Sequence, residues 1–283
     1  MTCDWESLLV LLPHWLRQES MMKNGSNVNE IRLRVGLPVE IVTGPVHRLI
    51  NRKATSDDIA FCINSASKYS PWSAATSASG YITSSGGHRV GICGEAVMKE
   101  GIITGIKNVT SVSIRVARDC PGMAKSIAPH CGSILILGAP GSGKTTLLRD
   151  LARILSKDHT VGVVDERGEL FPSKIPRGNR MDILTGIPKP QGMEIMLRTM
   201  TPEYIAVDEI TSTTDIKGFV HAAFCGCALL ATAHAGNKEE FYSRAIYQSL
   251  LDQRIFDWIV ELKQDYSYTV GRAKSCHTNC LVL

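Results

Sequence analysis

The pattern of apolar and polar positions changes near the middle of the chain. In the first part, Glu30–Val35 alternates apolar Ile31, Leu33 and Val35 with charged residues, which predicts a half-buried strand. Short segments of a similar kind follow, separated by glycines, and this spacing is typical of antiparallel strands. These segments are Val39–Thr43, Gly80–Thr83, Arg89–Val97, Gly101–Thr104 and Val112–Val116. We therefore expect an α+β domain that contains an antiparallel meander.

Two helical regions accompany these strands. Trp5–Met22 has a mixed apolar face that Pro13 interrupts, which predicts one or two short helices. A further helix is expected to run to about Lys68, with Thr55 or Ser56 as its N-cap.

From Met123 onward, short continuous apolar runs alternate with polar or helix-prone segments. Such runs are typical of strands in a parallel sheet that helices cover on both faces. The runs are Ile134–Leu137, Val161–Asp165, Tyr204–Asp208 and Leu229–Thr232. Trp258–Leu262 and Tyr266–Val270 have the pattern of a late hairpin. The expected fold class is α/β, with a mainly parallel sheet and helices on both faces, preceded by a smaller α+β domain.

The length of 283 residues is sufficient for two domains of ordinary size. Pro121-Gly122 breaks helices and strands alike, so we place the boundary between a domain of residues 1–122 and one of residues 123–283. A content of 44% apolar and 20% charged residues indicates a globular protein. Because no apolar run is long enough to span a membrane, we expect a cytoplasmic protein without a transmembrane segment.

Nine cysteines are present, an odd number that does not suggest a disulfide framework in a cytoplasmic protein. Most are expected to be small core residues. The two clusters are Cys225-Gly-Cys227 and the group Cys276, His277 and Cys280. Neither cluster alone supplies the four ligands of a structural metal site, so metal binding at Cys276, His277 and Cys280 stays open.

Residues 138–145 read GAPGSGKT, which is the GxxxxGK[ST] phosphate-binding pattern between a buried strand and the expected helix Thr146–Leu155. Glycines allow successive backbone N–H groups to point at phosphate oxygens, and the helix N-terminus adds positive potential. Lys144 would bind the β- and γ-phosphates, and the hydroxyl of Thr145 would bind Mg²⁺. The loop therefore predicts ATP and Mg²⁺ as ligands. The expected nucleotide-binding residues are Gly138, Ala139, Pro140, Gly141, Ser142, Gly143, Lys144, Thr145 and Thr146.

Acidic pairs and a histidine follow other strands of the same domain. Ligands of open parallel sheets lie beyond the carboxyl ends of the strands, so these residues are candidates for the site. Asp208 would join Thr145 at the Mg²⁺ ion, and Glu209 would orient or deprotonate the attacking water. Asp165-Glu166 ends another strand, although aspartate is also common there for reasons of turn geometry. His234 could contact the γ-phosphate.

An arginine at the transition state accelerates phosphoryl transfer by about 10³ to 10⁵. Candidates in the two parts of the chain are Arg32, Arg34, Arg89, Arg115, Arg118, Arg167, Arg180 and Arg198. The sequence does not select among them. Arg89 and Arg115 are preferred as residues that act on a neighbouring subunit, because each lies on a predicted strand of the first domain.

Longer motifs resemble one family in particular, the stage III sporulation protein AA family of ATPases. They are EIRLRVGLPVEI (30–41), GHRVGICGEAV (87–97), VDERGEL (164–170), RMDILTGIPKPQGMEIMLRTMTPEYIAVDEI (180–210) and LLATAHAG (229–236). This family is related to the traffic ATPases of type II and type IV secretion and of type IV pili. The resemblance covers nearly the whole chain.

The resemblance implies a role for each candidate residue. It puts Asp165 and Glu166 in an acidic "Asp box", Asp208 and Glu209 in the Walker B motif, His234 in a "His box", and Arg198 at an arginine that precedes Walker B. It further implies a RecA-like core, an N-terminal domain that rotates against that core, and a homo-oligomeric, hexameric ring with active sites between subunits. The implied partners are membrane proteins of a channel between mother cell and forespore, with the ATPase peripheral to the membrane on the mother-cell side.

A RecA-like, nucleic-acid-dependent ATPase is the alternative. Plastid and cyanobacterial relatives add a single-strand-binding module at the C-terminus, for which this chain leaves no room after the late hairpin. The net charge of +4 without a basic block also provides little attraction for a phosphate backbone, so no nucleic-acid partner is expected. A nucleotide kinase would need an arginine-rich lid after the phosphate loop, and none is found.

Overall fold

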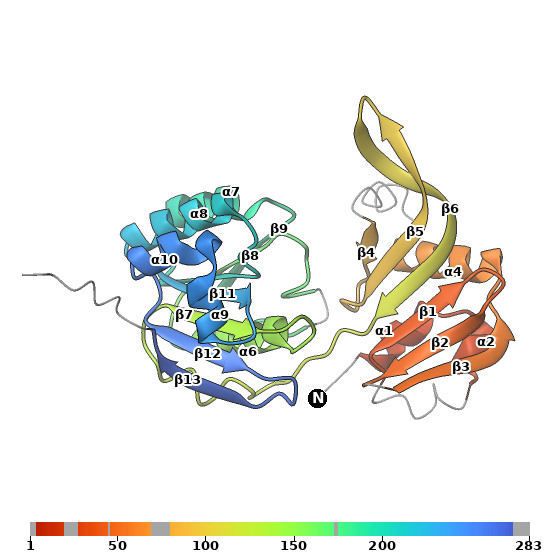
Figure 1. Cartoon of the computed structure of the whole chain (residues 1–283), viewed down its shortest axis with the longest axis horizontal. Coiled ribbons are helices and arrows are strands. Elements are labelled where there is room, and N and C mark those ends of the chain that lie inside the picture. The colour runs from red at the N-terminus through yellow and green to blue at the C-terminus, as the bar shows by residue number, and fades with distance from the viewer. Residues whose placement is uncertain (1–3, 20–27, 45, 69–79, 173–174, 274–283) are drawn as a thin grey trace, which may run out of the picture. The chain divides into compact units, whose positions relative to one another are not determined.

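A computed structural model describes residues 4–19, 28–44, 46–68, 80–172 and 175–273. The chain divides into two compact units (Figure 1). Unit 1 comprises Met1–Asp119 and Pro172–Ile175, and unit 2 comprises Cys120–Phe171 and Pro176–Leu283. Each unit is described by itself.

Unit 1 is built on a six-stranded antiparallel sheet with the strand order β3-β2-β1-β6-β5-β4. The strands are β1 (Glu30–Arg34), β2 (Pro38–Thr43), β3 (Val46–Lys53), β4 (Tyr81–Thr83), β5 (Arg89–Lys99) and β6 (Ile102–Arg115). The helices are α1 (Trp5–Val10), α2 (His14–Arg17) and α4 (Ser56–Ala66). The expected antiparallel sheet is therefore present, as two three-stranded meanders joined through β1 and β6.

Local sequence accounts for several of these elements. The alternation in β1 buries Ile31 and Leu33 completely, as expected of a half-buried strand. Thr55 begins α4 with a capping box, in which its side chain accepts from the backbone of Asp58 while Asp58 accepts from the backbone of Thr55. The interruption at Pro13 separates α1 from α2, as expected.

One expectation for unit 1 is wrong, and one strand was missed. The long strand β6 includes most of the two segments that were expected as separate strands, Gly101–Thr104 and Val112–Val116. The strand continues between them because its irregularities, which are register shifts against β5 and a positive φ of 48° at Asn108, do not end the pairing. Strand β3 was not expected, because it buries none of its side chains completely and so has no apolar alternation. The distal part of the β5–β6 ribbon extends beyond the other strands of the sheet (Figure 1).

Unit 2 contains a seven-stranded sheet with the order β13-β12-β7-β11-β10-β8-β9, in which every pairing except β12 with β13 is parallel. The strands are β7 (Ile134–Gly138), β8 (Val161–Asp165), β9 (Met181–Thr185), β10 (Tyr204–Val207), β11 (Ala228–His234), β12 (Trp258–Leu262) and β13 (Tyr268–Arg272). The helices are α6 (Lys144–Leu155), α7 (Lys189–Thr199), α8 (Thr213–Phe224), α9 (Lys238–Ser243), η2 (Ala245–Tyr247) and α10 (Gln248–Asp252). This mainly parallel sheet confirms the expected α/β fold class.

Helices cover both faces of this sheet (Figure 1). On one face, Met193 of α7 and Phe219 of α8 join Leu135 of β7 and Ile205 of β10 in a continuous buried cluster. Helix α6 lies on the other face and buries Leu147, Leu148 and Leu151. Central strands that are buried on both faces explain why the apolar runs in the sequence are continuous. The expected late hairpin is formed by β12 and β13, whereas the half-exposed edge strand β9 was not expected.

Candidate functional site

The phosphate-binding loop connects β7 to α6 at the carboxyl end of the sheet. Gly141 and Gly143 have φ values of 76° and 96°, which only glycine adopts readily. A Cβ atom at Gly138 would lie 2.5 Å from Oγ of Ser142 and 2.9 Å from the carbonyl oxygen of Leu262, so the loop requires glycine there for space. The sequence therefore folds this segment into a tight turn at the N-terminus of α6.

Lys144 is the first residue of α6 and is only 6% exposed. Its Nζ atom donates to the carbonyl oxygens of Gly138 and Ala139, each at 2.9 Å. Burial lowers the pKa of Lys144 below its ordinary value, while the negative charges of Glu209 and Asp208 oppose this shift. The lysine is thus held inside the loop, where two carboxylates influence its ammonium group electrostatically.

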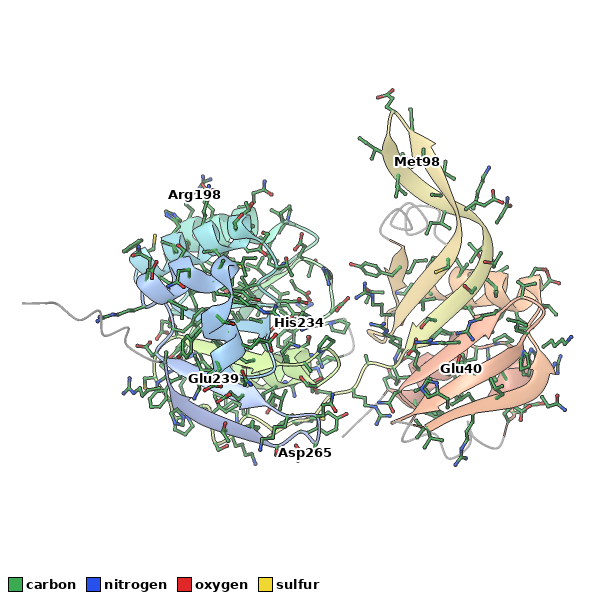
Figure 2. All side chains as sticks on the ribbon, viewed as in Figure 1. Glu40, Met98, Arg198, His234, Glu239 and Asp265 are labelled. Atoms are coloured by element: carbon green, nitrogen blue, oxygen red, sulfur yellow. The ribbon has the colours of Figure 1, made fainter. Side chains whose placement is uncertain are left out.

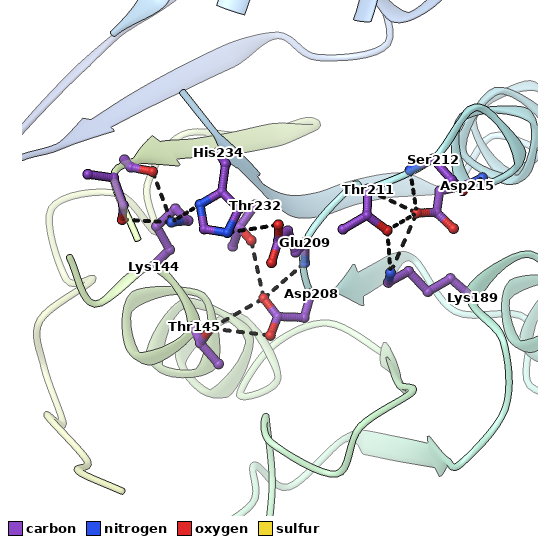
Figure 3. A network of polar contacts seen from close by, with 12 residues as sticks. Lys144, Thr145, Lys189, Asp208, Glu209, Thr211, Ser212, Asp215, Thr232 and His234 are labelled. Atoms are coloured by element: carbon purple, nitrogen blue, oxygen red, sulfur yellow. Dashed lines mark hydrogen bonds and ion pairs between the residues drawn. The ribbon is translucent and has the colours of Figure 1, made fainter. Parts of the chain in front are cut away.

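His234, at the end of β11, connects this lysine to Glu209 (Figure 3). Its Nδ1 atom lies 2.9 Å from Nζ of Lys144, and its Nε2 atom lies 2.8 Å from Oε1 of Glu209. An ammonium group has donors and no acceptor, so Nδ1 is the acceptor and the ring proton is on Nε2, which donates to the carboxylate. A neutral imidazole with this tautomer satisfies both contacts.

The carboxylate of Asp208 accepts hydrogen bonds from three residues. It accepts from the hydroxyl of Thr145 at 3.2 Å, from the hydroxyl of Thr232 at 3.1 Å and from the backbone N–H of Glu209 at 2.9 Å. The carboxylate and the Thr145 hydroxyl are hard oxygen donors of the kind that Mg²⁺ prefers, so this donor set fits a magnesium ion. Thr232 is an addition to the expected residues, and its position two residues before His234 on the same strand places both on one face.

Asp165 and Glu166, at the end of β8, have different surroundings. Asp165 is 1% exposed, and its carboxylate accepts from the backbone N–H groups of Glu169, Leu170 and Phe171 at 2.9 to 3.2 Å. Burial raises the pKa of Asp165, although these backbone bonds act against the shift. Asp165 therefore stabilises its own loop, which agrees with the turn-geometry interpretation. Glu166 is more exposed and pairs with Lys189 at 3.2 Å.

A second polar cluster, missed by the sequence reasoning, lies beside the first (Figure 3). Lys189 contacts Asp215 at 3.5 Å and the hydroxyl of Thr211 at 3.4 Å. Asp215 also accepts from the backbone N–H groups of Thr211 and Ser212, at 2.9 and 3.1 Å. Burial would raise the pKa of Asp215, but the Thr211 hydrogen bonds and the charge of Lys189 bring it below its ordinary value. No sequence pattern distinguishes Lys189 from a surface lysine.

Among the candidate arginines, Arg198 is separate from this network. Arg198 lies on the exposed side of α7, where it pairs with Glu194 at 3.7 Å, and Figure 2 shows it at the outer end of that helix, away from His234. Arg89 and Arg115 belong to unit 1, where they are direct cross-strand neighbours on β5 and β6. The guanidinium of Arg89 also lies 3.9 Å from the centre of the Tyr81 ring.

The cysteine clusters have no assigned ligand. Among the residues that the structure describes, no three His, Cys, Asp or Glu side chains lie together in a way that could hold a metal ion. Cys225 is exposed with its sulfur 3.9 Å from Nε2 of His221, and Cys227 is buried. Cys276, His277 and Cys280 lie outside the described residues.

In the described part of the chain, the helices are too short or too polar to cross a membrane.

The fold of the chain is that of the RecA-like secretion ATPases. The structure superposes on the ATPase DotB of Legionella pneumophila with a TM-score of 0.60 and 18% identity, covering 92% of this chain and 79% of DotB. It also superposes on the pilus retraction motor PilT with a TM-score of 0.56 and 13% identity, covering 82% of this chain and 73% of PilT. These similarities define the class of fold, a P-loop core of the secretion type.

Within that class, the chain belongs to the family described as "Sporulation stage III, protein AA", whose model matches residues 7–275. It is 33% identical to stage III sporulation protein AA of Bacillus subtilis (strain 168) over an alignment of 254 residues, and the match covers 84% of this chain and 83% of that protein. The family resemblance expected from the sequence is confirmed.

Proposed function

We propose that this protein is an ATP-hydrolysing motor. The observation that carries the proposal is the convergence of Lys144, Thr145, Asp208, Glu209 and His234 within one hydrogen-bonded network at the carboxyl ends of three neighbouring parallel strands. Phosphoryl transfer to water requires three kinds of group: a lysine that binds phosphate, oxygen ligands for magnesium, and a carboxylate that acts on the attacking water.

Each residue has a distinct role in this proposal. The backbone of Gly138–Thr146 binds the phosphates, and Lys144 neutralises charge on the β- and γ-phosphates. Thr145 and Asp208 hold Mg²⁺, which neutralises phosphate charge when it is bound. Glu209 orients or deprotonates the attacking water, with His234 fixing the direction of its carboxylate.

We further propose that the chain works as a homo-oligomeric, hexameric ring. Residues 1–122 would be a mobile domain and residues 123–283 the ATPase domain. Arg89 or Arg115, which are cross-strand neighbours on β5 and β6 of the first domain, would reach the site of a neighbouring subunit. Arg89→Ala should then reduce ATP turnover while ATP affinity stays nearly unchanged. A loss of binding with normal turnover per bound nucleotide would contradict this role.

The biological role follows the family. Since the Bacillus subtilis relative is a stage III sporulation protein, we propose that the ATPase energises the assembly of, or transport through, a channel between mother cell and forespore. Its partners would be membrane proteins of that channel, and it would be cytoplasmic and peripheral to the membrane on the mother-cell side.

The test is the rate of ATP turnover per subunit, measured against protein concentration with Mg²⁺ present and repeated with EDTA. The wild type is compared with Glu209→Ala and with the control Glu194→Ala, an exposed glutamate on α7. A rate that rises with concentration, requires Mg²⁺ and is lost only in Glu209→Ala supports a ring-forming ATPase. Absence of turnover at all concentrations would contradict the proposal, and stimulation by single-stranded DNA would favour a nucleic-acid-dependent ATPase instead.

A further inference from the structure

Lys189 occupies an unfavourable position for a lysine. It is the first residue of α7, is 6% exposed, and follows Pro188, which provides no side-chain cap. The N-terminus of a helix carries partial positive charge, so a cation there is disfavoured. Burial of an ammonium group is also costly unless anionic partners surround it. The buried position of Lys189 therefore depends on the anionic and polar groups that contact its ammonium group.

Those groups come from two different loops. Glu166 Oε2, at 3.2 Å, belongs to the loop after β8. Asp215 Oδ2, at 3.5 Å, and Thr211 Oγ1, at 3.4 Å, belong to the segment after β10. Strands β8 and β10 are neighbours in the parallel sheet. One ammonium group thus joins the acidic carboxyl ends of two adjacent strands.

The two loops differ in how firmly they hold their carboxylates. Asp215 is fixed by the backbone of Thr211 and Ser212 and by the capping box of α8. Thr211 follows Glu209 by two residues, so this anchor restrains the segment that carries the candidate catalytic glutamate. By contrast, the side chain of Glu166 is 38% exposed, and an ion pair with Lys189 restrains its carboxylate.

We propose that Lys189 is a positioning residue for the ATPase reaction. Lys189 fixes the carboxylate of Glu166 relative to the segment that follows Glu209. The acidic residues at the ends of β8 and β10 then face the bound nucleotide together. This inference rests on the proposed ATPase function, because the two acidic strand ends act together only during hydrolysis. Without Lys189, Glu166 rotates freely and the binding of ATP is largely preserved.

The kinetic test compares Lys189→Met with Lys189→Arg and with the control Lys217→Met, an exposed lysine on α8. We expect Lys189→Met to lower kcat roughly 10- to 100-fold with little change in KM for ATP, because small displacements of catalytic groups act mainly on the chemical step. Lys189→Arg should recover part of the rate, and Lys217→Met should match the wild type. A lower melting temperature with unchanged kcat would show a merely structural lysine and overturn the inference.

A double-mutant cycle with Glu166→Gln tests whether Lys189 acts through Glu166. The double variant should be no slower than the slower single variant, whereas multiplied rate losses would overturn the inference. The same four proteins are then compared by thermal unfolding, which does not depend on turnover. If the wild type hydrolyses no ATP, the proposed function fails. The unfolding cycle then tests the coupling between Lys189 and Glu166 separately. Additive changes in melting temperature would overturn the inference, and non-additive changes would support it.

Discussion

Nδ1 of His234 lies 2.9 Å from Nζ of Lys144, while Nε2 of the same ring lies 2.8 Å from the carboxylate of Glu209. Strand β11 lies between β7 and β10 in the sheet, so a residue at its carboxyl end falls between the phosphate loop and the segment after β10. The histidine is therefore placed to respond to any movement of the lysine or of the glutamate.

His234→Ala should reduce kcat for ATP roughly 10- to 100-fold, because hydrogen bonds to charged groups contribute about 1.5–3 kcal/mol and about 1.4 kcal/mol corresponds to a factor of ten. Steady-state turnover measures this effect. His221→Ala, at an exposed histidine on α8, is the control and should leave the rate unchanged. Equal rates for His234→Ala and the wild type would show that the bridge has no part in hydrolysis.

Asp165→Ala and Glu166→Gln should separate stability from activity. Asp165→Ala removes the acceptor of three backbone N–H groups, and unsatisfied buried groups cost about 1–3 kcal/mol each. We expect a clear fall in melting temperature for this variant. Glu166→Gln should keep the wild-type melting temperature within a few degrees and lose turnover. The opposite assignment of effects would mean that Asp165 acts in the reaction and Glu166 in the fold.

Gly192→Ala should destabilise unit 2. A Cβ atom there would lie 2.5 Å from Cγ1 of Val164 and 3.1 Å from Cγ2 of Ile187, so α7 would have to move away from β8. Overpacking of this kind costs about 1–3 kcal/mol. Calorimetry should show a lower melting temperature. The adjacent exposed Gln191→Ala is the control, and it should be neutral or slightly stabilising because alanine favours helices. Equal melting temperatures for the two variants would contradict this close packing.

Glu40 on β2 should make the stability of unit 1 depend on acidity (Figure 2). Hydrogen bonds from His47 and then from Arg34 lower the pKa of Glu40 to about 2, from an ordinary value of 4.5. The folded state then binds fewer protons than the unfolded state between these values, so stability is present above pH 4.5 and is lost as the pH falls toward 2.

The two partners of Glu40 are partly exposed, so solvent screening limits the effect to about 1 kcal/mol. Glu40→Gln should flatten the dependence of the melting temperature on pH within this acid range. Glu95→Gln, at an exposed glutamate whose ion pair with Lys107 is longer at 3.8 Å, is the control and should leave the dependence unchanged. Identical acid profiles for Glu40→Gln and the wild type would contradict the role of Glu40.

Much of the fold could be predicted because its signals are local. The buried strands β7, β8, β10 and β11 have continuous apolar runs, and the capping residue of α4 is adjacent to the helix that it begins. Strand β9 and strand β3 could not be predicted in this way, because edge strands with exposed side chains carry no apolar pattern. Backbone pairing with a neighbour stabilises such strands, and pairing is a property of the folded sheet.

The sequence by itself determined the loop from Gly138 to Thr145, because glycine conformations and a strand-to-helix turn are properties of adjacent residues. It also determined the family, through motifs spread over the whole chain. Only the tertiary structure decided that His234 lies between Lys144 and Glu209, and that Lys189 joins Glu166 to Asp215. These contacts depend on the order of strands in the sheet and on helix packing, which are set by burial across the whole unit rather than by neighbours along the chain.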